Sequence, residues 1–205
     1  MKKAIKRLMT LVLCTSLMFG ISSKASALEP RATTLSDPFT PSVWHNMAHS
    51  WAGDFSEYAG VMNASTDGSV TNLTKVNLYA FEAVNSDVRN RTQKFLVANP
   101  DGLGYRVYVN DQYNALTAFG YTLNRYTVSP TSEGYKCVLY RNLSSEVPYS
   151  VIDLRTVSAA NRQYRIQLVS GGYYLQSPSP TSSADLRWAN YQENNKFLWQ
   201  SVNVG

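Results

Sequence analysis

Short runs in which apolar and aromatic residues alternate with polar ones fill the chain from Tyr58 to its end. The runs are separated by turn sequences such as Asp67-Gly68 and Gly171-Gly172. An alternation with a period of two is typical of β-strands that bury one face, and Gly-Gly supplies the positive φ of a tight hairpin. The pattern therefore predicts an all-β domain built from many short strands.

The runs recur as an internal repeat of roughly fifty residues in three copies. The stretch around Trp188 in the third copy has counterparts around Tyr140 and Tyr79. The aromatic anchors that follow these stretches are Phe95, Tyr149 and Phe197. One copy is too small to bury its own apolar face. We therefore expect three copies to close around a pseudo-threefold axis that the anchors fill.

Two short motifs end at these anchors: Asn-Asn-Lys-Phe at 194–197 and Thr-Gln-Lys-Phe at 92–95. They are similar to the Asn-Gln-x-Trp motif of the ricin-B-type β-trefoil lectins, with Phe in place of Trp. The resemblance covers about Trp51 to Gly205. It implies a β-trefoil of three pseudo-repeats, in which a barrel of hairpin strands is capped by further hairpins.

The resemblance also implies a carbohydrate site in the third copy. A sugar presents apolar C–H faces and hydroxyl rims, so its site needs an aromatic platform and planar polar side chains. Residue by residue, Gln176 takes the place of the family's Asp, Trp188 or Tyr191 that of the platform, and Asn194 with Asn195 that of the amides. A charged acceptor makes stronger hydrogen bonds than Gln. The resemblance thus implies a weaker or altered glycan site than the family's galactose site.

The first fifty residues differ in character from the repeats. Residues 1–27 read as a bacterial signal peptide, with a cationic start, an apolar stretch too short to cross a bilayer comfortably, and an Ala-x-Ala cleavage signature at 25–27. Residues 28–50 are expected to form an N-terminal arm, with a short helix over Trp44–Tyr58. The trefoil domain would then occupy 51–205, and the protein would be secreted to the extracellular space.

Both histidines lie in the expected helix. His45 and His49 are four residues apart, which on a helix places both imidazoles on one face and suits a metal ion. However, Asn46 stands where the Glu of a His-Glu-x-x-His motif would be. The pair is a candidate metal site, with surface histidines as the alternative interpretation, and no cofactor is predicted.

Removal of the signal peptide changes the charge balance. It holds five of the 19 basic residues and none of the 14 acidic ones, so 14 of each remain. A nucleic-acid partner needs a net positive footprint, which the remaining chain does not supply. No later apolar run is long enough to span a membrane. Cys137 is then the one remaining cysteine and lies in an apolar run, which predicts a buried, inert thiol.

No nucleophile elbow, phosphate-binding loop or dinucleotide fingerprint is present, so no enzyme is predicted. A paired-carboxylate glycosidase and a metal-dependent enzyme centred on His45 and His49 stay open as alternatives. The leading hypothesis is a secreted, non-catalytic, lectin-like protein that binds glycans, alone or as the cell-binding component of a toxin with a partner chain. The alternative is a protein-interaction trefoil, such as a protease inhibitor or toxin subunit, that uses the loop Thr122–Gly134.

Overall fold

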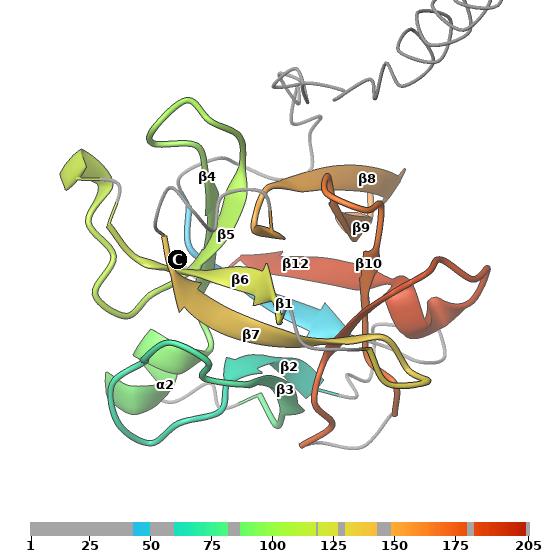
Figure 1. The fold of residues 1–205 in the computed structure, drawn as a ribbon, viewed down its shortest axis with the longest axis horizontal. Coiled ribbons are helices and arrows are strands. Elements are labelled where there is room, and N and C mark those ends of the chain that lie inside the picture. The colour runs from blue at the N-terminus through green and yellow to red at the C-terminus, as the bar shows by residue number, and fades with distance from the viewer. Residues whose placement is uncertain are drawn as a thin grey trace, which may run out of the picture. The chain divides into compact units, whose positions relative to one another are not determined.

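The part of the chain that the structure, a computed structural model, describes is built on one sheet of twelve strands (Figure 1). The described residues are 43–49, 60–81, 87–117, 119–126, 130–142, 149–179 and 183–203, and all lie in the unit Ala32–Gly205. The predicted signal peptide falls outside them. The strands are β1 (His45–His49), β2 (Gly60–Ala64), β3 (Val76–Tyr79), β4 (Phe95–Ala98), β5 (Arg106–Val109), β6 (Tyr121–Arg125), β7 (Tyr135–Arg141), β8 (Ile152–Ser158), β9 (Gln163–Leu168), β10 (Tyr174–Gln176), β11 (Arg187–Ala189) and β12 (Trp199–Asn203).

Six of these strands form a closed barrel. β1 pairs with β12 and β4, β4 pairs with β5, and β9 pairs with both β8 and β12, all antiparallel. Between β5 and β8, the Ile152 amide donates a hydrogen bond of 2.9 Å to the Tyr105 carbonyl. This contact completes the ring, so the barrel strands leave no open edge.

Three hairpins, β2–β3, β6–β7 and β10–β11, meet one another beside the barrel. Each hairpin contacts the next through a bridge between equivalent positions, and a second pair, Tyr135–Trp188, also joins β7 to β11. The bridges are Lys75–Val138, Lys136–Arg187 and Asp185–Asn77. A barrel of hairpin strands with three symmetric cap hairpins is a β-trefoil, which confirms the predicted fold class.

The same bridges determine which residues of the three repeats correspond. The bridged residues Asn77, Val138 and Arg187 correspond to one another. The residues that follow them are Leu78, Leu139 and Trp188, and all three are fully buried in the central apolar cluster. Cys137 lies in the same cluster, as predicted, and burial raises the pKa of its thiol. The core is therefore built from one large apolar side chain per hairpin.

This correspondence corrects the predicted alignment of the repeats by one residue. The aromatic pattern pairs Trp188 with Tyr140 and Tyr79, but those tyrosines follow the buried leucines and are half-buried on the other face of their strands. Their true counterpart in the third repeat is Ala189. Because side chains alternate between faces along a strand, a shift of one residue exchanges core and outward positions.

The three aromatic anchors were predicted to fill a common axis in the core, and of the three only Phe95 lies in the central cluster. Phe95 is fully buried in the central cluster. Phe197 is buried outside that cluster, where its ring centroid lies 5.5 Å from that of Tyr191. Tyr149 is half-buried, with the guanidinium carbon of Arg125 4.9 Å from its ring centroid. The anchors recur in sequence, yet they do not fill one common axis.

The helix predicted over Trp44–Tyr58 is wrong where the structure describes it. Residues His45–His49 form β1, which pairs with β12 over five residue pairs. All five residues are buried, so the strand lacks the alternation by which an exposed strand is recognised. The end of the expected arm is thus a barrel strand, and residues 50–59 lie outside the described stretches.

Helices are short in the described part of the chain. They include α2 (Asp87–Thr92) and the 3-10 helices η1 (Ala115–Thr117) and η3 (Asn195–Phe197). None of the helices in these stretches is long and apolar enough to cross a bilayer.

Candidate functional site

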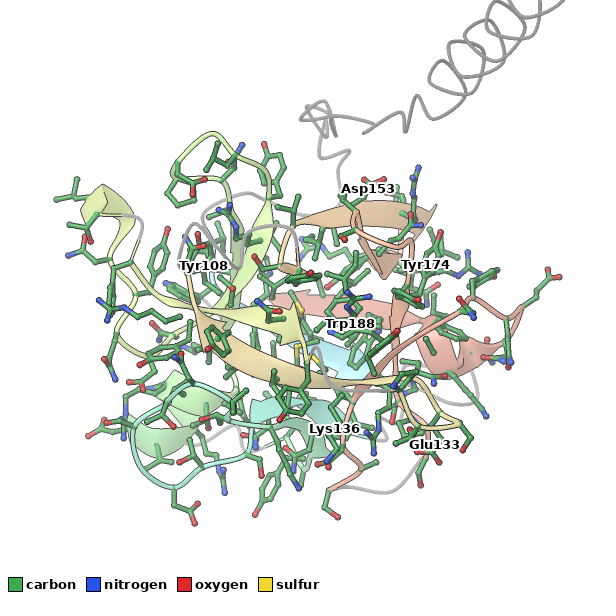
Figure 2. The ribbon with its side chains drawn as sticks, viewed as in Figure 1. Tyr108, Glu133, Lys136, Asp153, Tyr174 and Trp188 are labelled. Atoms are coloured by element: carbon green, nitrogen blue, oxygen red, sulfur yellow. The ribbon has the colours of Figure 1, made fainter. Side chains whose placement is uncertain are left out.

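A hollow of about 410 Å³ opens beside the third repeat. Its walls come from the end of β10, the connections on either side of the β10–β11 hairpin, η3, and the turn between β6 and β7. Figure 2 shows Glu133 at the turn of the β6–β7 hairpin and Tyr174 on β10, the two elements between which the hollow lies. Two neighbouring repeats therefore contribute to one site.

The turn between β6 and β7 is held close to β11. Thr131 and Gly134 exchange backbone hydrogen bonds of 3.0 Å, which close the turn. Gly134 has φ +108, and a Cβ there would collide with the carbonyl of Trp188. Only glycine allows this approach. The loop predicted over Thr122–Gly134 is wrong at its start, because Tyr121–Arg125 form strand β6.

Gln176, a predicted site residue, lines the hollow. Its Nε2 donates a hydrogen bond of 2.8 Å to the backbone carbonyl of Glu133. Since only the NH₂ group can donate to a carbonyl, the amide oxygen remains as the acceptor. The next amide, that of Ser177, donates to the Lys196 carbonyl at 3.0 Å. The end of β10 is thus hydrogen-bonded to the β6–β7 turn on one side and to η3 on the other.

Two tyrosines form an aromatic wall of the hollow. The rings of Tyr135 and Tyr173 meet edge to face with centroids 5.1 Å apart, and their side-chain hydrogen bond raises the pKa of Tyr135. The guanidinium carbon of Arg125 lies 4.6 Å and 5.5 Å from the two centroids. A Cβ at Gly171 would lie 2.6 Å from the Tyr173 ring, so the Gly-Gly turn packs closely against it. These contacts orient the wall before any ligand arrives.

Neither residue of this wall was predicted from the sequence. Tyr173 follows the Gly171-Gly172 turn, a signal that the sequence does contain. Tyr135 belongs to the neighbouring repeat and carries no such signal. Only the pairing of β11 with β7, in which Trp188 is opposite Tyr135, brings it to the site.

Neither predicted platform lines the hollow. Trp188 is fully buried, and its Nε1 donates to the Asn124 carbonyl at 3.1 Å, so the prediction that it stacks on a sugar is wrong. Ala189, the next residue on β11, faces the hollow in its place. Tyr191 is 40% exposed but lies outside the lining, with the guanidinium carbon of Arg165 4.9 Å from its ring centroid.

The two predicted asparagines stand next to the hollow rather than in its lining. Asn194 caps η3, because its Oδ1 accepts a hydrogen bond of 3.0 Å from the Lys196 amide. Its Nδ2 donates to Gln192 Oε1 at 3.4 Å. Asn195 is exposed as the first residue of η3. Asn194 thereby supports the loop that carries Gln192 and Lys196, which do line the hollow.

The histidine pair is buried in β1 and is neither exposed nor grouped with further metal ligands. The Nδ1 of His45 lies 2.9 Å from the Ser201 hydroxyl, and the Nε2 of His49 lies 2.9 Å from the Lys196 carbonyl. Burial lowers the pKa of His49 to about 4. The part of the chain described here contains no group of three His, Cys, Asp or Glu side chains that could hold a metal ion.

No protein-family model matches the sequence, and no curated protein matches it. Solved structures are similar. The designed threefold-symmetric protein ThreeFoil has a TM-score of 0.59 and 13% identity, over 78% of this chain and 99% of that one. The ricin B-like lectin of Macrolepiota procera, in complex with lactose, has a TM-score of 0.56 and 11% identity, over 80% of this chain and 98% of the lectin. A mosquitocidal holotoxin has a TM-score of 0.56 and 12% identity, over 79% of this chain and 17% of the toxin chain. At these identities the likeness shows the fold alone, and the chain is a β-trefoil.

Proposed function

We propose that the protein binds carbohydrate at the hollow of the third repeat. The observation that carries this proposal is the preoriented pair of Tyr135 and Tyr173 rings in the same hollow as the amide of Gln176. Tyrosine rings can contact the apolar C–H face of a sugar, while an amide oxygen accepts hydrogen bonds from its hydroxyls. Both kinds of contact are available within one hollow.

The size and charge of the hollow fit a neutral saccharide. Its volume of about 410 Å³ lies in the range of small-ligand sites, which is about 300–1,000 Å³. Asn190 and Gln192 add two further amides to the lining. Among the described residues of the lining, one acid, Glu133, and one base, Lys196, carry opposite charges, which suits a neutral ligand.

The number of carboxylates among the described lining residues agrees with a role in binding rather than in catalysis. A glycosidase of the common type needs a pair of carboxyl groups about 5–9.5 Å apart. Among the described residues that line the hollow, Glu133 is the one carboxylate, and its Oε2 lies 3.9 Å from Nε of Arg187. A second carboxylate for the acid and base roles is not part of this lining.

The wider role that we propose is that of a secreted binding protein or the binding component of a toxin. The predicted signal peptide, residues 1–27, supports export from the cell. The likeness of this trefoil to 17% of the chain of a mosquitocidal holotoxin supports a role as part of a larger toxin assembly. The trefoil would then deliver the assembly to a glycan-bearing surface.

The test is a glycan array followed by titration of the best ligand with three variants. Tyr173→Leu removes an aromatic ring of the wall, and Gln176→Ala removes the amide. We expect each to weaken binding about tenfold or more, because each removes about 1.4 kcal/mol of contact free energy or more. Tyr191→Leu is the matched control, since it removes a tyrosine that the sequence predicted but that lies outside the lining. We expect it to bind like the original protein.

Two results would contradict the proposal. One is silence of the array across neutral, N-acetylated and acidic glycans. The other is loss of binding in Tyr191→Leu while Tyr173→Leu binds normally, which would move the site to the predicted platform. Thermal melting of each variant separates loss of binding from loss of fold.

A further inference from the structure

A second hollow, of about 670 Å³, lies at the second repeat. Its lining comes from the connection between β5 and β6 and from the end of β7. This connection spans eleven residues, 110–120, whereas the corresponding connection between β9 and β10 spans five, 169–173. The second hollow is therefore built on a connection six residues longer than its counterpart in the third repeat.

Hydrogen bonds within the connection between β5 and β6 close it into a loop. The backbones of Asn114 and Phe119 exchange hydrogen bonds of 2.8 Å and 3.1 Å. The Oδ1 of Asn114 accepts further hydrogen bonds from the amides of Leu116 and Thr117, at 3.0 Å and 3.3 Å. These contacts hold η1 in place, so Thr117 and Phe119 keep fixed positions at the hollow.

A strained residue lines the same hollow. Gln112 has φ +58, a left-handed conformation that side chains other than glycine rarely adopt. Such conformations are energetically unfavourable and gather at ligand sites. Both neighbours hold it there: Asp111 accepts a hydrogen bond of 2.6 Å from the Val70 amide, and the Tyr113 ring packs on Trp44 with centroids 5.5 Å apart. The anchored backbone places the exposed Gln112 side chain in the lining.

Arg141 gives this hollow a positive charge. Its guanidinium carbon lies 4.6 Å from the ring centroid of Phe119, and its backbone amide donates to Asn72 Oδ1 at 2.8 Å. No carboxylate among the described residues pairs with Arg141, and no acid occurs in the described lining. Exposed Arg155, by contrast, pairs with Asp153 at 2.7 Å. The Arg141 guanidinium group is thus positioned by an aromatic ring and remains available to an anion.

We infer that the second hollow binds an acidic saccharide, one that carries a carboxylate or sulfate group. Arginine binds such groups with two parallel hydrogen bonds. Gln112 and Thr117 offer an amide and a hydroxyl to the sugar hydroxyls, and Tyr113 offers a ring. This site differs from the third-repeat hollow in position and in charge.

The test follows backbone amide signals by NMR while glucuronate, glucose or inorganic sulfate is added to the protein. We expect glucuronate to shift the signals of Thr117 and Phe119, and glucose, its neutral counterpart, to leave them unchanged. Arg141→Gln should weaken the glucuronate effect about tenfold or more, since hydrogen bonds between two charged groups are stronger than those of a neutral amide. Arg155→Gln, which removes a paired arginine of similar exposure, should respond like the original protein.

Three results would overturn the inference: no shift with glucuronate, an unchanged shift in Arg141→Gln, or equal shifts with inorganic sulfate at the same concentration. The last would make the hollow a site for small anions rather than for a saccharide. Gln176→Ala separates the two hollows, because it should leave the glucuronate response intact whether or not the third-repeat hollow binds glycans.

Discussion

At the scale of single residues, the imidazole of His49 links the folded state to pH. Its Nε2 meets the Lys196 carbonyl, and a nitrogen can approach a carbonyl in this way only as a donor. The ring also packs on Trp199, with centroids 4.9 Å apart. Desolvation by burial therefore disfavours a second proton on the ring and outweighs the Lys196 hydrogen bond, which alone would raise the pKa.

We predict a loss of stability on acidification that depends on His49. Its pKa is about 4 in the folded protein and 6.5 for a solvated imidazole, so the unfolded chain takes up the proton first as the pH falls. Stability is lost from about pH 6.5 down to about pH 4, by on the order of 3 kcal/mol. Urea unfolding at pH 7 and pH 4 measures the loss. His49→Gln keeps an N–H donor without the titration, so an equally large loss in that variant would contradict the assignment.

At the scale of elements, one turn decides how the third-repeat hollow is built. The turn Thr131–Gly134 reaches β11 because Gly134 adopts φ +108 and has no side chain to strike the Trp188 carbonyl. Gln176 then donates to the Glu133 carbonyl and joins the turn to β10. The aromatic wall depends on this approach, since Tyr135 follows the turn directly.

We predict that Gly134→Ala destabilises the protein more than Gly102→Ala and also weakens glycan binding. Gly102 is the matched control: its φ is +74, but a Cβ there would meet nothing within 4 Å. Left-handed backbone alone costs an alanine about 1–2 kcal/mol, and the collision at Gly134 adds to that. Urea unfolding and glycan titration of both variants measure the two effects. Equal costs would show that the turn does not rely on close contact with β11.

At the scale of the whole molecule, stability comes from a core that all three repeats share. Leu78, Leu139 and Trp188 occupy equivalent positions and are fully buried in one cluster. The hairpins that carry them meet through backbone bridges, so no repeat buries its apolar side alone. Loss of a large side chain from one hairpin is therefore felt by the complete trefoil.

We predict that Trp188→Ala destabilises the whole domain by about 3–5 kcal/mol, through the cavity that it leaves. Tyr191→Leu, which changes an exposed ring of the same repeat, should cost about 1 kcal/mol or less. Chemical unfolding monitored by fluorescence and by circular dichroism measures both. If Trp188→Ala kept its stability and lost only glycan binding, the buried position of Trp188 would be contradicted.

The same residues show which features of the protein could be predicted from its sequence. Alternation and turn residues predicted the all-β class, and the repeat of aromatic stretches predicted the trefoil, because both patterns record which face of a short strand is buried. Gln176 was predicted as a site residue and lines the hollow. Tyr191, Asn194 and Asn195 were placed near it but lie outside its lining: Tyr191 packs on Phe197, Asn194 caps η3, and Asn195 is exposed.

The sequence by itself therefore determined the fold class, the number of repeats and the region of the candidate site. The tertiary structure decided the register that buries Trp188 and turns Ala189 outward, because one residue of shift leaves an aromatic pattern almost unchanged while it exchanges the two faces of a strand. It also decided that His45–His49 is a strand, and that Tyr135 joins the hollow of the next repeat. Both depend on pairing between segments far apart in the chain, which local patterns do not record.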